Sequence, residues 1–480
     1  MEKIDVKEIE ARLYRAYPLS GRWHNGFHLE MPFGLINDPN GLCFYQGAYH
    51  IFYQWNPLGC QHKNKSWAYV KTKDFVHYTL PTLAMTPTDI HDKDGCYSGC
   101  GFVDKGALRV LYTCNAKDEA GHRTLAQRLG TLQADGHIVK DEIVVAKEAK
   151  GYTPHYRDPY VFARDGARYF VLGAQNNEKK GRGVIYKELA NKWQLLGELK
   201  TAYADFGYMW ECPNLLQFAE GEALLFCPQG LEPQAYAFQN RYQSGYIAGK
   251  LNIADLSLTG GQFQELDRGF DFYAPQVLDN NDRHILLGWM GMPEDEADYP
   301  SAEDGWLFSL TVPRELRLSN GHIYQQPIEE LKALRQPATE TIWQADNVDS
   351  YQQTLADKSE IEFTVELGKA KAVAFDLIYG EERLSFSYDR VNQVMTIDRN
   401  GMKLGGRGQR QFILPADGKL QVQLLVDKSA VEVFFQQGLE TAATLIFPKE
   451  EANPVFAIKS AGKIKSLQGK SWTLDSFTFA

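Results

Sequence analysis

Residues 41–55 read GLCFYQGAYHIFYQW, in which two apolar segments flank a short turn at Gln46-Gly47. Two apolar runs joined by a short polar or glycine-containing turn are typical of a β-hairpin. The pattern occurs again in residues 99–114, 160–174, 214–229 and 275–289. A chain that repeats one hairpin in this way is expected to build a repeat architecture rather than one continuous sheet.

A short polar or aromatic motif precedes each hairpin. The motifs are Asn37-Asp38, Tyr97-Ser98, Arg157-Asp158, Glu211-Cys212 and Phe272-Tyr273, and their markers follow one another at intervals of 60, 60, 53 and 62 residues. A repeat of this length that contains strands predicts the blades of a β-propeller, one for each motif. A single acidic residue before a strand is often only a turn residue. Five motifs in phase instead predict that these side chains meet at one end of the axial channel.

The rest of the chain predicts a helix before the propeller and a second domain after it. Ile4, Ile9 and Leu13 lie near helical spacing within residues 3–16, and Pro18 ends the pattern. We expect the helix and the propeller to occupy residues 1–325, and a short linker helix to occupy residues 326–337. Residues 338–480 alternate in short strands, as a β-sandwich does. The predicted fold class is all-β: a five-bladed β-propeller followed by a C-terminal β-sandwich.

The composition excludes several classes of partner. A net charge of −10 argues against nucleic acid and anionic membranes, because both require a broad basic face. No segment is long and apolar enough to span a bilayer, and the first thirty residues contain no apolar run typical of a secretory signal. The abundant aromatic residues, 25 Tyr, 26 Phe and 9 Trp, favour strands and sugar-stacking sites. We therefore expect a small-molecule sugar as the partner.

The cysteines and histidines show no spacing typical of a disulfide framework or a metal site. There are seven cysteines, an odd number, at positions 43, 60, 96, 100, 114, 212 and 227. This usage indicates reduced thiols in the cytoplasm. Neither a metal nor another cofactor is expected.

Asp38 and Glu211 have the surroundings that cleavage of a glycosidic bond requires. One carboxylate must attack as an anion while the other donates a proton to the leaving oxygen. Asp38 suits the first role, because Asn37, Asn40 and the amides of the following turn stabilise an anion. Glu211 suits the second, because its apolar neighbours, such as Trp210, should raise its pKa.

Asp158 directly follows Arg157, whose charge should keep the carboxylate ionised. An ionised carboxylate is a poor proton donor and a good acceptor for sugar hydroxyls. Asp158 is therefore predicted to hold the substrate.

The chain also carries an ordered set of motifs: INDPNG, QWNP, YSG, RDP, ECP, DFYAPQ, GWM and PREL. In this order they resemble the signature blocks of glycoside hydrolase family 32, within which the bacterial sucrose-6-phosphate hydrolases are the most similar. The resemblance runs through residues 28–316, with the expected sandwich following. Two departures from the family pattern are Asn214, where relatives often have Asp, and residues 66–69, where many have Trp-Gly-His.

The resemblance implies a retaining β-fructofuranosidase that hydrolyses sucrose 6-phosphate, sucrose or both by double displacement. It implies that Asp38 is the nucleophile, that Glu211 is the acid/base, and that Asp158 binds fructosyl hydroxyls and stabilises the transition state. The further substrate contacts expected in the same site are Asn37, Gln54, Tyr97, Ser98, Arg157 and Trp289. Taken alone, Gln54, Tyr97, Ser98 and Trp289 fit packed strand ends as well as a sugar site.

The segment Gln61-His62-Lys63-Asn64-Lys65 is a basic run in an acidic protein. Such a run is usually only a solvated loop. Because it follows the QWNP motif, however, we expect it at the rim of the site. His62, Lys63 and Lys65 are predicted there to bind a phosphate on the glucosyl group of the substrate.

Other functions remain compatible with this sequence. Fructosyl transfer, or hydrolysis of fructo-oligosaccharides, uses the same fold and the same carboxylates. A non-catalytic sugar-binding propeller belongs to a different class, but binding alone does not require Asp38, Asp158 and Glu211 together. Release of reducing sugar from sucrose distinguishes an enzyme from a binding protein.

Overall fold

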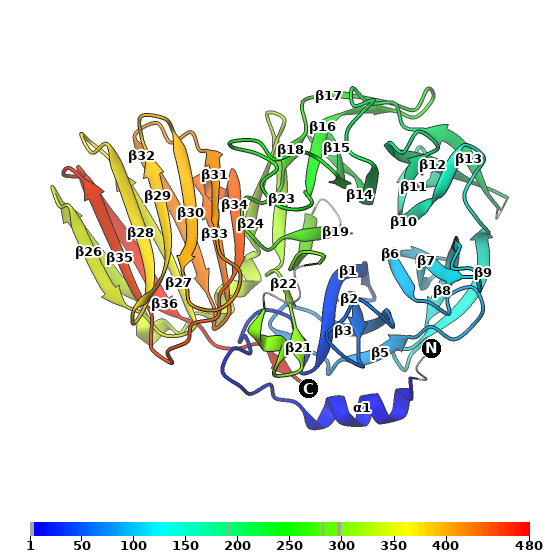
Figure 1. Cartoon of the computed structure of the whole chain (residues 1–480), viewed down its shortest axis with the longest axis horizontal. Coiled ribbons are helices and arrows are strands. Elements are labelled where there is room, and N and C mark those ends of the chain that lie inside the picture. Colours follow the sequence, from blue (N-terminus) through cyan, green and yellow to red (C-terminus); the bar gives the residue numbers. More distant parts are fainter. Residues whose placement is uncertain (1–3, 191, 281–282, 295–298) are drawn as a thin grey trace.

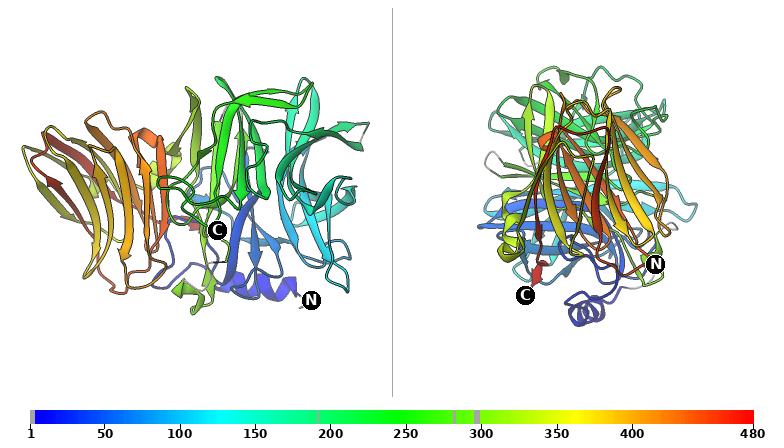
Figure 2. Two further views of the ribbon diagram at one scale, coloured as in Figure 1. Left: turned by 45° about the horizontal axis from the view of Figure 1, so that its top comes forward. Right: turned by 90° about the vertical axis from the view of Figure 1, so that its left-hand side faces the viewer.

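The protein is built almost entirely from β-strands, and its structure is a computed structural model that describes residues 4–190, 192–280, 283–294 and 299–480. Figure 1 shows sheets arranged about a common axis on one side and two stacked sheets on the other. The views in Figure 2 show the stacked sheets beside this ring. The predicted fold class, a β-propeller followed by a β-sandwich, is confirmed.

Among the described residues, the ring consists of five sheets. The first contains β1 (Gly34–Tyr45), β2 (Ala48–Asn56), β3 (Ser66–Thr72), β4 (His77–Tyr78), β5 (Thr82–Met85), β21 (Trp306–Leu307) and β37 (Thr478–Phe479). The second contains β6 (Cys96–Asp104), β7 (Ala107–Lys117), β8 (Arg123–Leu132) and β9 (Ile138–Val145). The third contains β10 (Tyr152–Arg164), β11 (Ala167–Asn176), β12 (Gly181–Leu189) and β13 (Lys192–Glu198). The fourth contains β14 (Met209–Phe218), β15 (Gly221–Gln229), β16 (Gly245–Asn252), β17 (Ser257–Gly260) and β18 (Gln264–Glu265). The fifth contains β19 (Tyr273–Asn280), β20 (Arg283–Met290), β22 (Ser309–Leu310), β23 (Arg314–Ser319) and β24 (His322–Pro327).

Each predicted hairpin supplies the first two strands of its own sheet. The pairs β1–β2, β6–β7, β10–β11, β14–β15 and β19–β20 are all antiparallel. The turn of the last hairpin includes residues 281–282, which lie outside the described residues. The five inner strands contact one another in a closed ring, in the order β1, β6, β10, β14 and β19. Strand β21 then pairs in parallel with β1 and joins the end of the ring to its beginning.

The C-terminal part is a sandwich of two six-stranded sheets. One has the order β25 (Thr341–Asp346), β36 (Ser466–Thr473), β27 (Ser359–Glu366), β32 (Lys419–Val426), β33 (Ala430–Phe435) and β34 (Glu440–Leu445). The other has the order β26 (Ser350–Thr354), β35 (Val455–Ala461), β28 (Ala372–Tyr379), β29 (Glu382–Asp389), β30 (Val394–Gly401) and β31 (Gln409–Ile413). Alternating apolar side chains from both sheets form a core separate from that of the ring.

Short helices flank the ring in sequence. Helix α1 (Val6–Arg15) begins at Asp5, whose carboxylate caps the first turn by accepting from the Glu8 amide. It lies below the first sheet in Figure 1. Between the ring and the sandwich, a 3-10 helix spans Glu329–Leu334 and buries Leu331 and Leu334. Residues 326–327, which we assigned to the linker helix, belong to strand β24.

Candidate active site

Each inner strand carries the same irregularity at the point where its motif lies. Between the register pairs that flank each motif, the inner strand has one residue more than its partner. Such bulges bend a strand locally and redirect side chains. In three of the strands a bulge residue has a positive φ: Asp158 at 67°, Cys212 at 47° and Ala274 at 46°. Because non-glycine residues rarely adopt this conformation, three strained backbone positions lie where the motifs converge.

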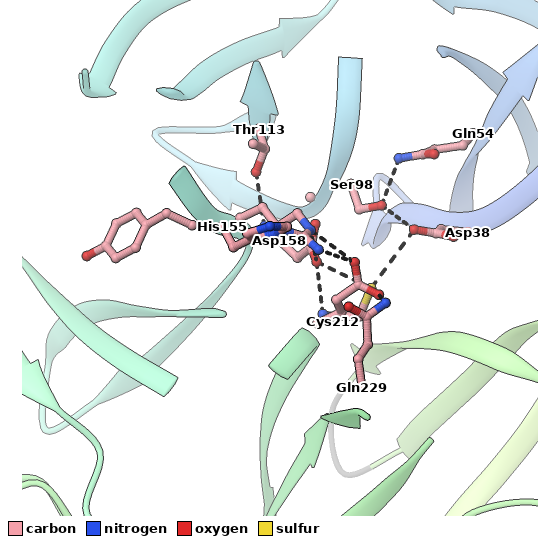
Figure 3. Close-up of polar contacts among 12 residues, drawn as sticks. Asp38, Gln54, Ser98, Thr113, His155, Asp158, Cys212 and Gln229 are labelled. Carbon is pink, nitrogen blue, oxygen red and sulfur yellow. Dashed lines mark hydrogen bonds and ion pairs between the residues drawn. The ribbon is translucent and has the colours of Figure 1, made fainter. Parts of the chain in front are cut away.

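Asp38 is held by its neighbours on both carboxylate oxygens. The Asn37 amide donates to Oδ1 at 3.0 Å, and the Ser98 hydroxyl donates to Oδ2. Gln54 connects these two donors, because its Oε1 accepts from Asn37 at 2.7 Å and its Nε2 donates to Ser98 at 2.8 Å. Figure 3 shows the Ser98 hydroxyl between Gln54 and Asp38, with a dashed line to each. This fixed, hydrogen-bonded carboxylate has the form that a nucleophile requires.

Asp158 lies on the other side of Cys212 from Asp38. The Cys212 sulfur is 3.9 Å from Oδ2 of Asp38 and 3.7 Å from Oδ2 of Asp158, and the Cys212 amide donates to the same Asp158 oxygen at 3.1 Å. The Asp158 amide in turn donates to the Thr113 hydroxyl at 3.0 Å. Asp38, Asp158 and Cys212 therefore come together from β1, β10 and β14 (Figure 3).

Glu211 is surrounded by hydrogen-bond donors. Arg157 donates to its Oε1 from Nε at 3.0 Å and from Nη2 at 2.6 Å. The Tyr273 hydroxyl donates to Oε2 at 2.6 Å, and the Gln229 amide donates to the same oxygen at 2.7 Å. Arg157 is itself oriented by His155, whose Nδ1 accepts from Nη1 at 2.9 Å.

These contacts reverse both expectations about ionisation. Burial alone would raise the pKa of Glu211, but the Arg157 charge and the hydrogen bonds from Tyr273 and Arg157 outweigh it, so the pKa is lowered. For Asp158 burial dominates and raises the pKa to about 7, with the Glu211 and Asp38 carboxylates adding to the effect and Arg157 opposing it. These contacts therefore favour a proton on Asp158 over a proton on Glu211. The apolar neighbours of Glu211 in sequence do not decide its pKa, because Arg157 reaches it from the adjacent sheet.

Of the remaining predicted residues, Lys65 and Trp289 contact other predicted site residues, whereas Lys63, among the described residues, does not. Lys65 points into the site, since its Nζ donates to Oε1 of Gln54 at 2.8 Å and lies 5.5 Å from the centre of the Tyr97 ring. Trp289 is buried with its ring edge against His62, at 5.4 Å between ring centres, and its indole N–H has no acceptor within the described part of the chain. Lys63, by contrast, is exposed, and the structure does not bring it to the carboxylates.

Sequence reasoning missed five residues that touch the carboxylates or position them. These are Thr113, His155, Cys212, Gln229 and Tyr273. Tyr273 carried a signal, because it opens the fifth repeat, but no role was assigned to it. Thr113, His155 and Gln229 belong to no motif, and only the pairing of strands brings them to the site.

Among the residues that the structure describes, no group of three or more His, Cys, Asp or Glu side chains is arranged to hold a metal ion. Asn214, which departs from the family pattern, is buried; it donates to the carbonyls of Cys212 and Pro275 and accepts from the Val277 amide. Its contacts are therefore structural and connect β14 to β19. Within the described ranges, no helix is long and apolar enough to cross a membrane.

Comparison with known proteins gives matches over nearly the whole chain. Residues 28–327 match the glycosyl hydrolases family 32 N-terminal domain, and residues 330–472 match the glycosyl hydrolases family 32 C-terminal domain. The sucrose-6-phosphate hydrolase of Bacillus subtilis is 35% identical over 463 residues, which is 93% of both chains. That of Staphylococcus xylosus is 36% identical over 477 residues, 96% of this chain and 94% of the relative. The solved sucrose-6-phosphate hydrolase from Lactobacillus gasseri superposes with a TM-score of 0.89 at 28% identity, over 99% of this chain and 98% of the other.

Proposed function

The chain belongs to glycosyl hydrolase family 32, and on this basis we propose that it is a retaining β-fructofuranosidase that hydrolyses sucrose 6-phosphate and sucrose. The products are fructose and glucose 6-phosphate, or fructose and glucose. Enzymes named sucrose-6-phosphate hydrolase are its relatives over more than nine-tenths of the chain. A Bombyx mori β-fructofuranosidase of the same family, solved with sucrose, superposes on the whole chain with a TM-score of 0.87 at 26% identity.

One observation supports the mechanism above all others: Asp38, Asp158 and Glu211 converge from three sheets onto one point. We assign Asp38 as the nucleophile, because hydrogen bonds fix both of its oxygens. Its attack on the fructosyl anomeric carbon forms a covalent intermediate as the bond to the glycosidic oxygen breaks. Glu211 gives that oxygen a proton and later activates the water that releases fructose. Two inversions at the same carbon give net retention.

Glu211 must carry a proton for the first step, whereas the empty site favours its anion. A bound sugar displaces water from the carboxylates and so disfavours their charged forms. We assign Asp158, which lies 3.1 Å from the Cys212 amide, to the fructosyl hydroxyls. In this scheme the proton on Asp158 is available within the carboxylate cluster when substrate enters.

The test is proton NMR of the fructose released in the first minutes of the reaction. We expect the β anomer first, followed by mutarotation. Initial release of the α anomer would exclude the double displacement, and absence of any hydrolysis of either sugar would exclude the function itself. A Glu211→Gln variant, which keeps the shape of the side chain and removes its acid, is the matched control.

A cytoplasmic location is part of this proposal. The seven cysteines are all free thiols, most of them buried, as in proteins of reducing compartments. A phosphorylated sugar is itself an intracellular substrate, because its charge prevents passive passage across a membrane. Activity confined to the cytoplasmic fraction of the source cell supports the assignment; activity in the medium would contradict it.

A further inference from the structure

Two cations from different sheets lie over the ring of Tyr97 at the edge of the site. The Lys65 Nζ is 5.5 Å from the ring centre, and the Arg123 Cζ is 5.9 Å from it. Lys65 directly precedes β3, and Arg123 is the first residue of β8. No motif singled out Arg123, which reaches this position only because β8 starts at the same end of the ring as the catalytic motifs.

Arg123 differs from the other arginines of its own and the next sheet. Arg109, Arg128, Arg168 and Arg182 each form an ion pair with an aspartate or a glutamate. Within the described ranges, Arg123 forms no ion pair, and its buried Nε has no hydrogen-bond acceptor. Asp118, in the turn before β8, contacts His122 instead. A half-buried guanidinium with an unused donor is costly unless a ligand supplies the missing acceptor.

The position of Arg123 places it on the leaving-group side of the site. Arg157 holds Glu211 and is itself held by His155. Burial, the Arg157 charge and the Arg123 charge lower the pKa of His155 to about 4, so the charge of Arg123 acts on this ring. Glu211, Arg157 and His155 thus form a chain of contacts, and the charge of Arg123 acts on its last member. Because Glu211 protonates the glycosidic oxygen, the glucosyl group leaves on this side.

We propose that Arg123 and Lys65, beside Tyr97, bind the phosphate on the sixth carbon of the glucosyl group of sucrose 6-phosphate. The inference rests on the proposed function and names the phosphate site within it. Arg123 supplies a planar set of donors that matches phosphate oxygens, and Lys65 supplies a point charge. The carboxylates of Asp38 and Glu211 repel an anionic substrate, so local cations are needed for a phosphorylated sugar and not for sucrose. Arg123 replaces the exposed Lys63 in this role.

The experiment measures kcat/KM for sucrose 6-phosphate and for sucrose in the wild type, Arg123→Gln, Lys63→Gln and Arg407→Gln. Arg407 lies exposed on the sandwich and is the matched control for loss of an arginine charge. We expect the wild type to prefer the phosphorylated sugar. Arg123→Gln should reduce this preference by about tenfold or more, mainly through KM, as loss of a charge-assisted hydrogen bond predicts. Sucrose turnover of the same preparation corrects for any loss of folded enzyme.

The outcomes separate this inference from the proposed function. If Arg123→Gln keeps the wild-type preference, or loses activity equally on both sugars, the phosphate site is wrong while the hydrolase function stands. A larger loss in Lys63→Gln than in Arg123→Gln overturns it in favour of the rim lysine. A wild type that cleaves both sugars equally overturns it as well, whereas a wild type that cleaves neither refutes the function. A second readout is how much more strongly glucose 6-phosphate inhibits the enzyme than glucose does. Of the three variants, only Arg123→Gln should show a smaller difference between the two inhibitors.

Discussion

Arg157 donates two hydrogen bonds to one oxygen of Glu211, at 3.0 Å from Nε and 2.6 Å from Nη2. The same guanidinium charge opposes the effect of burial on Asp158. One arginine therefore controls how protons are distributed between two carboxyl groups that lie on neighbouring strands. Because the groups interact, their titration belongs to the cluster rather than to either residue.

The first prediction concerns the alkaline limb of the pH profile. In the wild type this limb of kcat/KM should lie near pH 7, where the last proton leaves the cluster. Since the Arg157 charge lowers the pKa of both Glu211 and Asp158, its removal in Arg157→Gln should move the limb to higher pH. Activity should fall by about 10²-fold or more, because the acid is no longer oriented. Arg157→Lys, which keeps a charge, is the control; an unmoved limb in the glutamine variant would contradict the prediction.

The second prediction concerns stability. The pKa of Asp158 is raised from 3.8 to about 7 in the folded protein. Its contribution to the free energy of unfolding is therefore most favourable at low pH, and this contribution is lost as pH rises through about 7. Asp158→Asn removes a buried charge at pH 8 and should stabilise the fold there by up to about 4 kcal/mol, while turnover is lost. At pH 4 the gain should disappear. Calorimetric Tm values at both pH values test this, and an equal effect at both would refute it.

A third prediction follows from His28, which is buried where the ring meets the sandwich. Its Nδ1 lies 2.9 Å from Asp427 and its Nε2 lies 3.1 Å from Glu432. Burial would lower its pKa, but the two carboxylates outweigh it and raise the pKa to about 9. The stabilisation is therefore complete below pH 6.5 and is lost as pH rises through about 9, a change of about 3 kcal/mol.

Replacing His28 with Gln leaves the buried Asp427 carboxylate without its cation, while Glu432 keeps its ion pair with Arg314. Loss of one partner of a buried pair should cost about 3 kcal/mol near neutral pH. The variant should also lose the fall in stability between pH 6.5 and 9. His322→Gln, at an exposed histidine, is the control and should keep the wild-type pH dependence. A His28→Gln variant with an unchanged pH dependence would show that the histidine is neutral in the fold.

The fourth prediction tests how Asp38 is positioned. The Ser98 hydroxyl donates to Asp38 and accepts from the Gln54 amide at 2.8 Å. Ser98→Ala leaves that buried amide donor unsatisfied and frees the carboxylate to rotate, so kcat should fall by about 10- to 100-fold, equivalent to roughly 1–3 kcal/mol. Ser98→Thr retains a hydroxyl and should recover part of the loss. Wild-type kcat in the alanine variant would show that Asn37 alone orients Asp38.

Much of the fold was predictable, because each hairpin is local: two apolar runs and a turn appear within about fifteen residues. The closure of the ring was not predictable from the sequence. Residues 306–307 pair in parallel with residues 34–35, and nothing in either short segment indicates a partner so distant in sequence. The pairing of β37 with β4, in which Thr478 lies opposite His77, was equally unpredictable from the sequence.

For the site, the sequence identified the catalytic carboxylates but not their protonation. The repeated motifs located Asp38, Asp158 and Glu211, because each lies at or next to the bulge of an inner strand. Their protonation could not be predicted from neighbours in sequence. Arg157 adjoins Asp158 along the chain, yet its guanidinium makes its shortest contact with Glu211, 54 residues away. A pKa depends on such distances across sheets, which no local pattern contains.

The last prediction separates the two catalytic roles by chemical rescue. Asp38→Ala should lose nearly all turnover, and Glu211→Ala should lose about 10²- to 10⁴-fold, the usual contribution of a general acid. Azide can then replace either missing carboxylate. In Asp38→Ala, azide attacks the fructosyl carbon directly as the leaving group departs, which gives the α-fructosyl azide. In Glu211→Ala, with a substrate whose leaving group needs no proton, azide attacks the covalent intermediate and displaces Asp38, which gives the β-fructosyl azide. NMR of the two products measures the configurations. Both variants differ from the wild type by a truncated carboxylate in the same site, so each serves as the control for the other. The same configuration from both, or near-normal turnover in Asp38→Ala, would exclude Asp38 as the nucleophile.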